Sequence, residues 1–303
     1  MKKIYALLVI AFITFSCSES DDFSSSNEPQ FRQPIRPVIR LEPTKLARVV
    51  YSPGASNQQD WYFNAAGLLR KITKPNGTIL KDFFYDAHKN LITSHNYTTA
   101  GTYTYSFVYD SSNHITSLNG RAVIYNAATN QYVFYYQPII SNNPECPTCY
   151  DYTDRTEITL NSDLLITNER TYYLSSAGNY SYGGMFASYT NSNMIGVSGW
   201  TDPSGPIYHY DVNTNPLKQA LLPICRAMGI TDGSYFEKWA VGQYNSVNNL
   251  ASINYDDGMS ETYVYSYNAN NLPSNCTRNA YDGGNLISSH PFAIYYYQGD
   301  VIP

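Results

Sequence analysis

Residues 102–109 read Thr-Tyr-Thr-Tyr-Ser-Phe-Val-Tyr, and the fold class follows from this stretch. Every second position carries an aromatic ring, while the positions between the rings carry Thr, Thr, Ser and Val. Because successive side chains of a β-strand point to opposite faces of a sheet, this period of two predicts a strand with one aromatic face. Residues 260–267 repeat the scheme with Tyr263, Tyr265 and Tyr267.

Stretches of this kind share a common ending, in which an aromatic residue is followed by Asp or Asn, a short polar turn and an aliphatic residue. The copies are residues 61–69, 83–92, 107–115, 208–211, 243–250 and 265–272. The short Asp or Asn side chain can bond to the backbone two residues on and so ends the strand, and Gly or Asn later in the turn tolerates a positive φ. Three pairs of neighbouring copies lie 22, 24 and 23 residues apart (Phe63 to Tyr85, Tyr85 to Tyr109 and Tyr244 to Tyr267), which is enough for a β-hairpin.

We therefore predict a mainly all-β fold, an antiparallel β-meander interrupted by one short helix. A flat sheet of this length would expose reactive edges, so we expect a strongly curved sheet or a barrel-like body. The helix is predicted over residues 215–229, with Asn215 as N-cap, Pro216 in the first turn and Gly229 at the end. Pro223 is expected to kink or split it. Leu217, Leu221, Ile224 and Met228 form one apolar stripe. A second, weaker helix prediction falls on residues 235–239.

The N-terminus carries a targeting signal. Lys2 and Lys3 precede an apolar stretch that is too short to span a membrane, and residues 13–17 read Ile-Thr-Phe-Ser-Cys. This ending resembles a bacterial lipobox, although an ordinary secretory signal with an incidental cysteine is the alternative. We expect a lipoprotein signal peptide over residues 1–16 and lipidation of Cys17.

The segment after the signal has the composition of a linker. Residues 17–43 are rich in Ser, Asp, Glu, Gln and Pro, which predicts a flexible tether. Its acidic start, Ser-Glu-Ser-Asp-Asp at 18–22, resembles the surface-export signal of Bacteroidetes lipoproteins. Residues 44–303 are then expected to form a single β-meander domain, held by a lipid anchor at the outer membrane and facing the cell exterior.

The composition excludes several classes of protein. Only 14% of the 303 residues are charged while 15% are aromatic, which excludes a disordered solvating chain. A net charge of −5 without a basic stretch argues against a nucleic-acid partner. No interior run approaches the roughly 20 apolar residues of a membrane-spanning helix.

The remaining cysteines are candidates for structural disulfides. Cys146, Cys149, Cys225 and Cys276 would lie in an oxidising compartment and allow three pairings. A thiol-redox role for the Cys-Pro-Thr-Cys motif at 146–149 and a zinc site made of all four are the less favoured alternatives. The five histidines show no metal-ligand spacing, so we expect neither a metal site nor a cofactor.

The candidate binding residues are aromatic. Tyr103, Tyr105, Tyr263 and Tyr265 alternate on two strands, and such rings can stack on sugars or contact apolar ligands. The alternative is that these rings form the ordinary core of a curved sheet. No nucleophile elbow, phosphate loop or metalloprotease helix is present, so no catalytic residue is proposed.

At the level of families, the repeats resemble the YD-type repeats of Rhs-like proteins. Residues 45–300 resemble a family of Bacteroidetes lipoproteins of unknown function that has a porin-like β fold. The resemblance rests on the order of the YD-like turns, on Asn-Pro-Leu at 215–217 and on residues 265–273. It implies a secreted β-meander lipoprotein with no established activity.

Together these features predict a surface-exposed outer-membrane lipoprotein that is a non-catalytic binding or accessory module. Its partner would be a glycan, a lipid or an outer-membrane protein complex, besides the membrane that its lipid anchor enters. The alternative is a secreted glycan-active hydrolase that uses carboxylates from distant parts of the chain.

Overall fold

The computed structural model describes residues 44–135, 150–162, 165–175, 180–199, 205–228 and 246–302. The chain separates into two units, Met1–Arg40 and Leu41–Pro303, and every described residue belongs to the second. The expected signal peptide, Cys17 and tether lie outside the described residues, as do Cys146, Cys149 and the helix predicted over 235–239.

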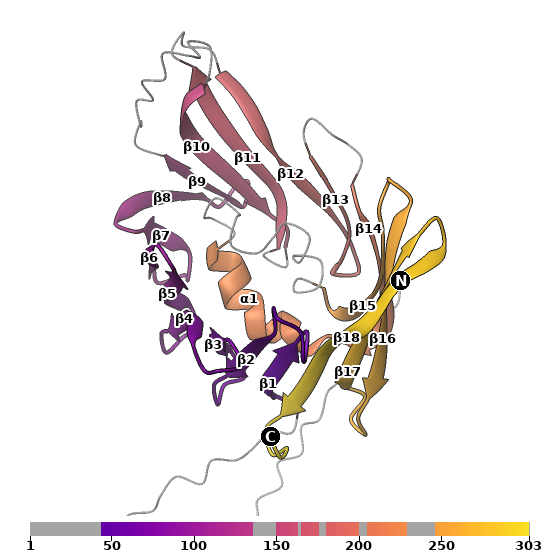
Figure 1. The fold of residues 1–303 in the computed structure, drawn as a ribbon. Coiled ribbons are helices and arrows are strands. Elements are labelled where there is room, and N and C mark those ends of the chain that lie inside the picture. Colours follow the sequence, from indigo (N-terminus) through magenta and orange to yellow (C-terminus); the bar gives the residue numbers. More distant parts are fainter. Residues whose placement is uncertain are drawn as a thin grey trace, which may run out of the picture. The chain divides into compact units, whose positions relative to one another are not determined.

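The described residues form eighteen β-strands and one α-helix (Figure 1). In chain order the strands are β1 (Leu46–Tyr51), β2 (Gln59–Phe63), β3 (Leu69–Thr73), β4 (Ile79–Tyr85), β5 (Leu91–Thr98), β6 (Gly101–Tyr109), β7 (Ile115–Leu118), β8 (Arg121–Asn126), β9 (Gln131–Tyr135), β10 (Tyr150–Leu160), β11 (Ile166–Ser175), β12 (Tyr180–Thr190), β13 (Asn193–Gly199), β14 (Ile207–Thr214), β15 (Asn248–Asn254), β16 (Met259–Tyr267), β17 (Pro273–Asp282) and β18 (Asn285–Tyr297).

The sheet is an up-and-down barrel. Each strand pairs antiparallel with the next, and β18 pairs antiparallel with β1, so the ring closes. Closure removes the exposed edges that a long open meander would leave. The all-β prediction is confirmed, and of its two forms the closed barrel is the one present.

Strand register sends the apolar side chains to the inside. Val49 faces Trp61 across β1 and β2, and the two are 0% and 5% exposed. Phe134 on β9 faces Thr156 on β10, and both are buried. These core residues belong to one cluster that also contains residues of the helix, which Figure 1 shows within the ring of strands.

That helix is α1 (Pro216–Met228), and it was predicted nearly residue for residue. The Asn215 side-chain oxygen accepts the backbone N–H of Leu217 at 3.0 Å, which confirms the N-cap. Leu217, Leu221 and Ile224 are buried in the barrel core, as their spacing requires. Pro223 lies within the helix and does not split it, because the contacts of this apolar stripe hold both halves in the core.

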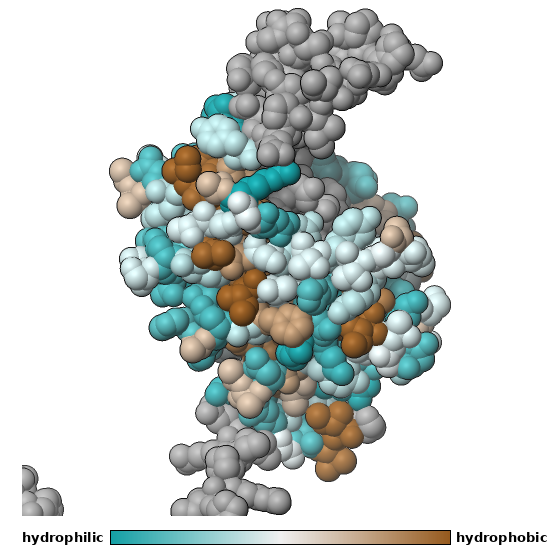
Figure 2. All heavy atoms as spheres, turned by 90° about the vertical axis from the view of Figure 1, so that its left-hand side faces the viewer, coloured by the Kyte–Doolittle hydropathy of each residue, from teal (hydrophilic) through white to brown (hydrophobic). Residues whose placement is uncertain are grey.

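The outward face of the barrel carries ion pairs. Arg48 and Asp60, which alternate with core residues on β1 and β2, approach to 3.0 Å. Arg155 and Glu157 on β10 approach to 2.9 Å. On the face shown in Figure 2, hydrophobic residues are scattered singly among hydrophilic ones. The one helix that the structure describes is too short to cross a membrane.

The predicted turns adopt one common geometry. In the first, the side-chain oxygen of Asn64 accepts the backbone N–H groups of Ala66 and Leu68, both at 3.0 Å. The backbone N–H of Asn64 donates to the Leu68 carbonyl at 2.9 Å, and Gly67 has a φ of 80°. Four further turns, which begin at Asp86, Asp110, Asn161 and Asn268, repeat the side-chain bond to the residue four positions on.

All five turns lie at the same end of the barrel, because each joins an even-numbered strand to the odd-numbered strand that follows it. We call this end the Asx end. The β14–α1 connection and the start of β1 lie there as well, since β14 and β18 also run toward it. The repeat seen in the sequence therefore marks one rim of the barrel.

The tyrosines of the repeat explain why an aromatic residue precedes the turn. Five tyrosines, each partly or fully buried, donate a hydroxyl hydrogen bond to a backbone carbonyl of the preceding strand. The acceptor is the first or second residue of that strand. We call these residues the clamp tyrosines. The bonds are Tyr85 to Leu69 (2.6 Å), Tyr109 to Leu91 (2.8 Å), Tyr189 to Ile166 (2.9 Å), Tyr210 to Met194 (2.6 Å) and Tyr297 to Pro273 (2.9 Å). Burial raises the pKa of each of these hydroxyls.

Candidate functional site

A cavity of about 1010 Å³ opens at the Asx end, between α1 and the turns. Its walls come from segments far apart in the sequence: residues 44–46, the turns around residues 66–68, 88–90 and 112–115, and the helix from Pro216 to Arg226. The turns reach it because the Asx geometry folds them back at the rim. The helix reaches it because its apolar stripe is buried in the core and its other side is left facing the turns.

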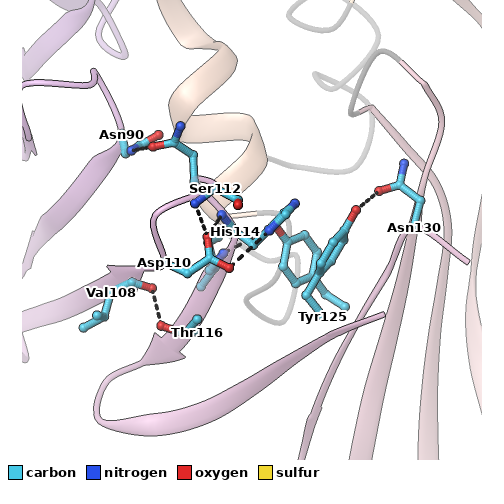
Figure 3. A network of polar contacts seen from close by, with 11 residues as sticks. Asn90, Val108, Asp110, Ser112, His114, Thr116, Tyr125 and Asn130 are labelled. Atoms are coloured by element: carbon cyan, nitrogen blue, oxygen red, sulfur yellow. Dashed lines mark hydrogen bonds and ion pairs between the residues drawn. The ribbon is translucent and has the colours of Figure 1, made fainter. Parts of the chain in front are cut away.

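One wall is a network built on the turn of Asp110 (Figure 3). The Asp110 carboxylate accepts the backbone N–H groups of Ser112 and His114, both at 2.8 Å, and its second oxygen lies 3.2 Å from His114 Nδ1. The backbone bond from His114 is the main cause that holds the pKa of Asp110 below its ordinary value. This carboxylate is therefore ionised at neutral pH and engaged within its own turn.

The His114 ring is held on its other side by stacking. It lies against Tyr125 with ring centroids 3.9 Å apart and planes 17° apart. The Tyr125 hydroxyl donates to the side-chain oxygen of Asn130 at 2.8 Å, and the Asn130 amide donates to the carbonyls of Leu160 and Asn161. The imidazole is thus fixed between a carboxylate and an aromatic ring, which gives the wall a rigid polar edge.

Neighbouring turns are joined to one another. The Asn90 amide donates to Asp86 at 3.1 Å and to the side-chain oxygen of Asn113 at 2.9 Å, which couples the turn after β4 to the turn after β6. The second oxygen of Asp86 accepts the backbone N–H of Asn90 at 2.8 Å. The two carboxylates that flank the cavity are consequently both occupied by turn donors.

The charged residues that the structure describes in the lining are all basic. They are Lys45, Lys89, Lys218 and Arg226, and no Asp or Glu is among the described lining residues. A hydrolase that uses two carboxylates in one cleft, the alternative considered from the sequence, finds no support in this lining. Amide groups, hydroxyl groups and many apolar side chains complete the wall, so the cavity is suited to hold a ligand that has both hydrogen-bonding and apolar parts.

The tyrosines proposed from the sequence lie elsewhere. Tyr103 and Tyr105 are on β6 and Tyr263 and Tyr265 on β16, strands that are not paired with each other. Tyr103 is 56% exposed, whereas Tyr263 is 7% exposed and belongs to the core cluster. None of the four lines the cavity at the Asx end. Their role in binding stays a prediction.

The expectation of disulfides needs a correction for two cysteines. Cys225 and Cys276 are free thiols in the structure, one on α1 and the other on β17. Burial raises the pKa of each to about 12, so neither is a reactive thiolate. The reason is packing: each thiol is part of, or packed against, the apolar core at its own position.

Sequence reasoning did not identify the residues of the cavity. The histidines were considered only as metal ligands, and His114, Lys89, Lys218 and Arg226 were not singled out. One local signal was available, because Lys89 occupies the turn position that Gly67, Asn113 and Asn271 occupy in other copies. A lysine with a φ of 68° is unusual there.

Comparison with known proteins adds three structures. The chain matches no protein-family model and no curated protein. A porin-like protein from Bacteroides uniformis is 11% identical with a TM-score of 0.41, over 86% of this chain and 99% of that one. A porin-like protein from Bacteroides vulgatus is 9% identical with a TM-score of 0.30, over 84% and 99%. TcdB2-TccC3 without its hypervariable C-terminal region is 10% identical with a TM-score of 0.30, over 80% of this chain and 13% of that one.

Proposed function

We propose that this protein is a non-catalytic binding module of the outer membrane, lipidated at Cys17 and exposed to the cell exterior, that holds its ligand in the cavity at the Asx end. The observation that carries the binding role is the cavity itself. It is large and concave, and one of its walls is fixed by hydrogen bonds of the turns and of the strand next to them. Such preformed concave sites are where small molecules and short chains bind.

The outward face supports an anchored barrel over a membrane-spanning one. A spanning barrel presents an apolar band to lipid, where a Lys or Arg at mid-depth costs about 2–4 kcal/mol. Here the partly exposed Arg155 and Glu157 lie on the face opposite the core. The inside is apolar and holds α1, which is the arrangement of a water-soluble body.

Membrane attachment through Cys17 is tested by fractionation. The Cys17→Ala variant is expected to leave the membrane fraction, because acyl chains supply the attachment at about 0.8 kcal/mol per buried CH₂. The Cys225→Ala variant is the matched control, since it removes a cysteine thiol without touching the lipidation site. Retention of the Cys17→Ala variant in membranes would refute the anchor. Protease digestion of intact cells tests exposure to the exterior.

The cavity is tested by filling it. Gln219 is an exposed residue of α1 in the lining, so Gln219→Trp places a large ring in the cavity and leaves the buried stripe intact. Val212 is 92% exposed outside the lining, and Val212→Trp is the control for an added surface ring. On a glycan array we expect binding that survives Val212→Trp and is lost in Gln219→Trp. Equal binding by both variants would contradict the assignment of the cavity.

A further inference from the structure

We infer that the cavity at the Asx end selects an acidic saccharide, meaning a sugar chain that bears carboxylate groups. The inference rests on the proposed binding function and names the chemical class of its ligand. It starts from the four cations of the lining, Lys45, Lys89, Lys218 and Arg226. They gather at one end of a chain whose net charge is −5, so the local sign is opposite to that of the whole protein.

Lys89 and Arg226 are not paired with the acids nearby. Asp86 and Asp110 flank the cavity, and both use their oxygens for N–H donors of their own turns and for Asn90 and His114. Within the described residues, Lys89 and Arg226 form no ion pair with either of them. These two cations can therefore interact with an anionic ligand in the cavity, where a low-dielectric wall strengthens the attraction between charges.

Arg226 is the most informative of the four. It lies near the end of α1, is exposed and lines the cavity. A guanidinium presents a planar fork of N–H donors that matches both oxygens of a carboxylate. Across the described part of the chain, no carboxylate is paired with it. A ligand carboxylate would fill that place.

Lys89 gives an independent reason, from the comparison of turns within the chain. Its position in the turn requires a left-handed backbone, and the corresponding positions hold Gly67, Asn113 and Asn271. Those residues adopt this conformation at little cost, whereas a long side chain does so at a cost. The turn itself therefore gains nothing from a lysine. The turn at Asp86 differs from the other Asx turns in that it places an exposed lysine in the cavity lining.

The neutral groups favour a sugar over a free ion. Ser112 and Gln219 offer a hydroxyl and an amide group beside the apolar side chains of the lining, and Tyr125 adds an aromatic ring, which is the combination that recognises hydroxyl-rich rings. The volume of about 1010 Å³ lies at the upper end of small-molecule sites. It is far larger than a single inorganic anion needs, and a short saccharide fits such a space.

The test is calorimetric titration of the purified full chain, carrying Cys17→Ala for solubility, with trigalacturonate and with the neutral maltotriose. We expect trigalacturonate to bind and maltotriose to bind at least about tenfold more weakly. Raising the salt concentration should weaken the binding of trigalacturonate, because screening reduces attraction between exposed charges.

Two charge-removing variants locate the site. Arg226→Gln should weaken binding of trigalacturonate by about tenfold, and it preserves helix propensity. Lys89→Asn should weaken it by about threefold, and it supplies a residue suited to the left-handed position. The controls are Arg121→Gln and Lys74→Asn, which remove exposed cations at the opposite end of the barrel and should leave binding unchanged. Circular dichroism of each variant verifies the fold.

The outcomes separate this inference from the proposed function. Equal binding of both sugars, with no effect of Arg226→Gln, would overturn acidic selectivity while leaving a binding cavity in place. If neither sugar binds but anionic phospholipid vesicles do, in a manner that depends on Arg226, the ligand is a lipid headgroup and the saccharide inference is wrong. If Gln219→Trp retains full binding of trigalacturonate, the binding is outside the cavity and both proposals fail.

Discussion

Replacing Tyr297 with Phe removes one oxygen atom from the last turn of the barrel and leaves the aromatic ring in place. The Tyr297 hydroxyl donates to the Pro273 carbonyl at 2.9 Å, and the side chain is 2% exposed. The bond ties the end of β18 to the start of β17, next to the seam where β18 pairs with β1. This variant isolates the contribution of a single clamp hydroxyl to the closed barrel.

The expected loss of stability follows from the burial of the acceptor. Without the hydroxyl, the Pro273 carbonyl loses a partner in a site that water does not reach, which costs about 1–3 kcal/mol. The ring still fills its volume, so no cavity contribution is added. For a barrel of this size each kcal/mol lowers Tm by about 2–4 °C. We therefore expect Tm to fall by roughly 2–12 °C.

The assay is urea unfolding followed by tyrosine fluorescence and circular dichroism. The midpoint should fall while the slope m stays unchanged, because the same surface is exposed on unfolding. Tyr103→Phe is the control, since Tyr103 is 56% exposed and its hydroxyl is not part of a clamp. A Tyr297→Phe variant as stable as the parent would refute the clamp, and equal destabilisation by Tyr103→Phe would show that tyrosine hydroxyls act in some other way.

Three more outcomes follow from the fold. Asn268→Ala should destabilise the barrel by about 1–2 kcal/mol in urea titrations, because the N–H groups of Asn270 and Leu272 lose their shared acceptor. The Asn268→Asp variant keeps an acceptor oxygen and should lose much less stability. Leu221→Ala in α1 should cost about 2–5 kcal/mol, since this side chain is 0% exposed in the core. Stability should also fall at alkaline pH. Burial raises the folded pKa of the clamp tyrosines above the unfolded value near 10, so their contribution to the free energy of unfolding is complete below about pH 10 and is lost above it. The loss is about 1.4 kcal/mol per pH unit for each tyrosine. Unfolding titrations at increasing pH would show this, and a flat profile above pH 10 would contradict it.

Much of the barrel could be predicted from local patterns. The alternation in residues 102–109 and 260–267 corresponds to strands β6 and β16. The copies at 61–69, 83–92, 107–115 and 265–272 each form an Asx turn, whereas the copy at 208–211 lies within β14 and the turn at Asn161 was not predicted. The helix was predictable because Asn215, Pro216 and the apolar stripe all indicate the same element. These are local signals, and each is decided by a few neighbouring residues.

Closure and the cavity were not predictable, because they depend on contacts between distant residues. The pairing of β1 with β18 joins Leu46 to Tyr297, and no periodicity within either strand specifies that partner. The cavity unites Lys45, Lys89 and Arg226 only because the barrel closes and α1 lies inside it. Pro223 was expected to kink or split the helix, and of these two outcomes the split does not occur, because the helix runs from Pro216 to Met228.

The repeated turn connects the fold to the proposed binding role. In the turns after β4 and β6, the structural needs are met by the Asx side chain and a clamp tyrosine, which leaves the other turn residues free to vary. At the Asx end those variable positions hold His88, Lys89, Ser112 and His114, all of which line the cavity. At such a rim, one set of turn residues stabilises the fold and another set contacts the ligand, as is common for loops on a rigid scaffold. Substitutions at Lys89 should therefore change ligand binding with little effect on stability, whereas substitutions at Asp86 or Tyr85 should do the reverse.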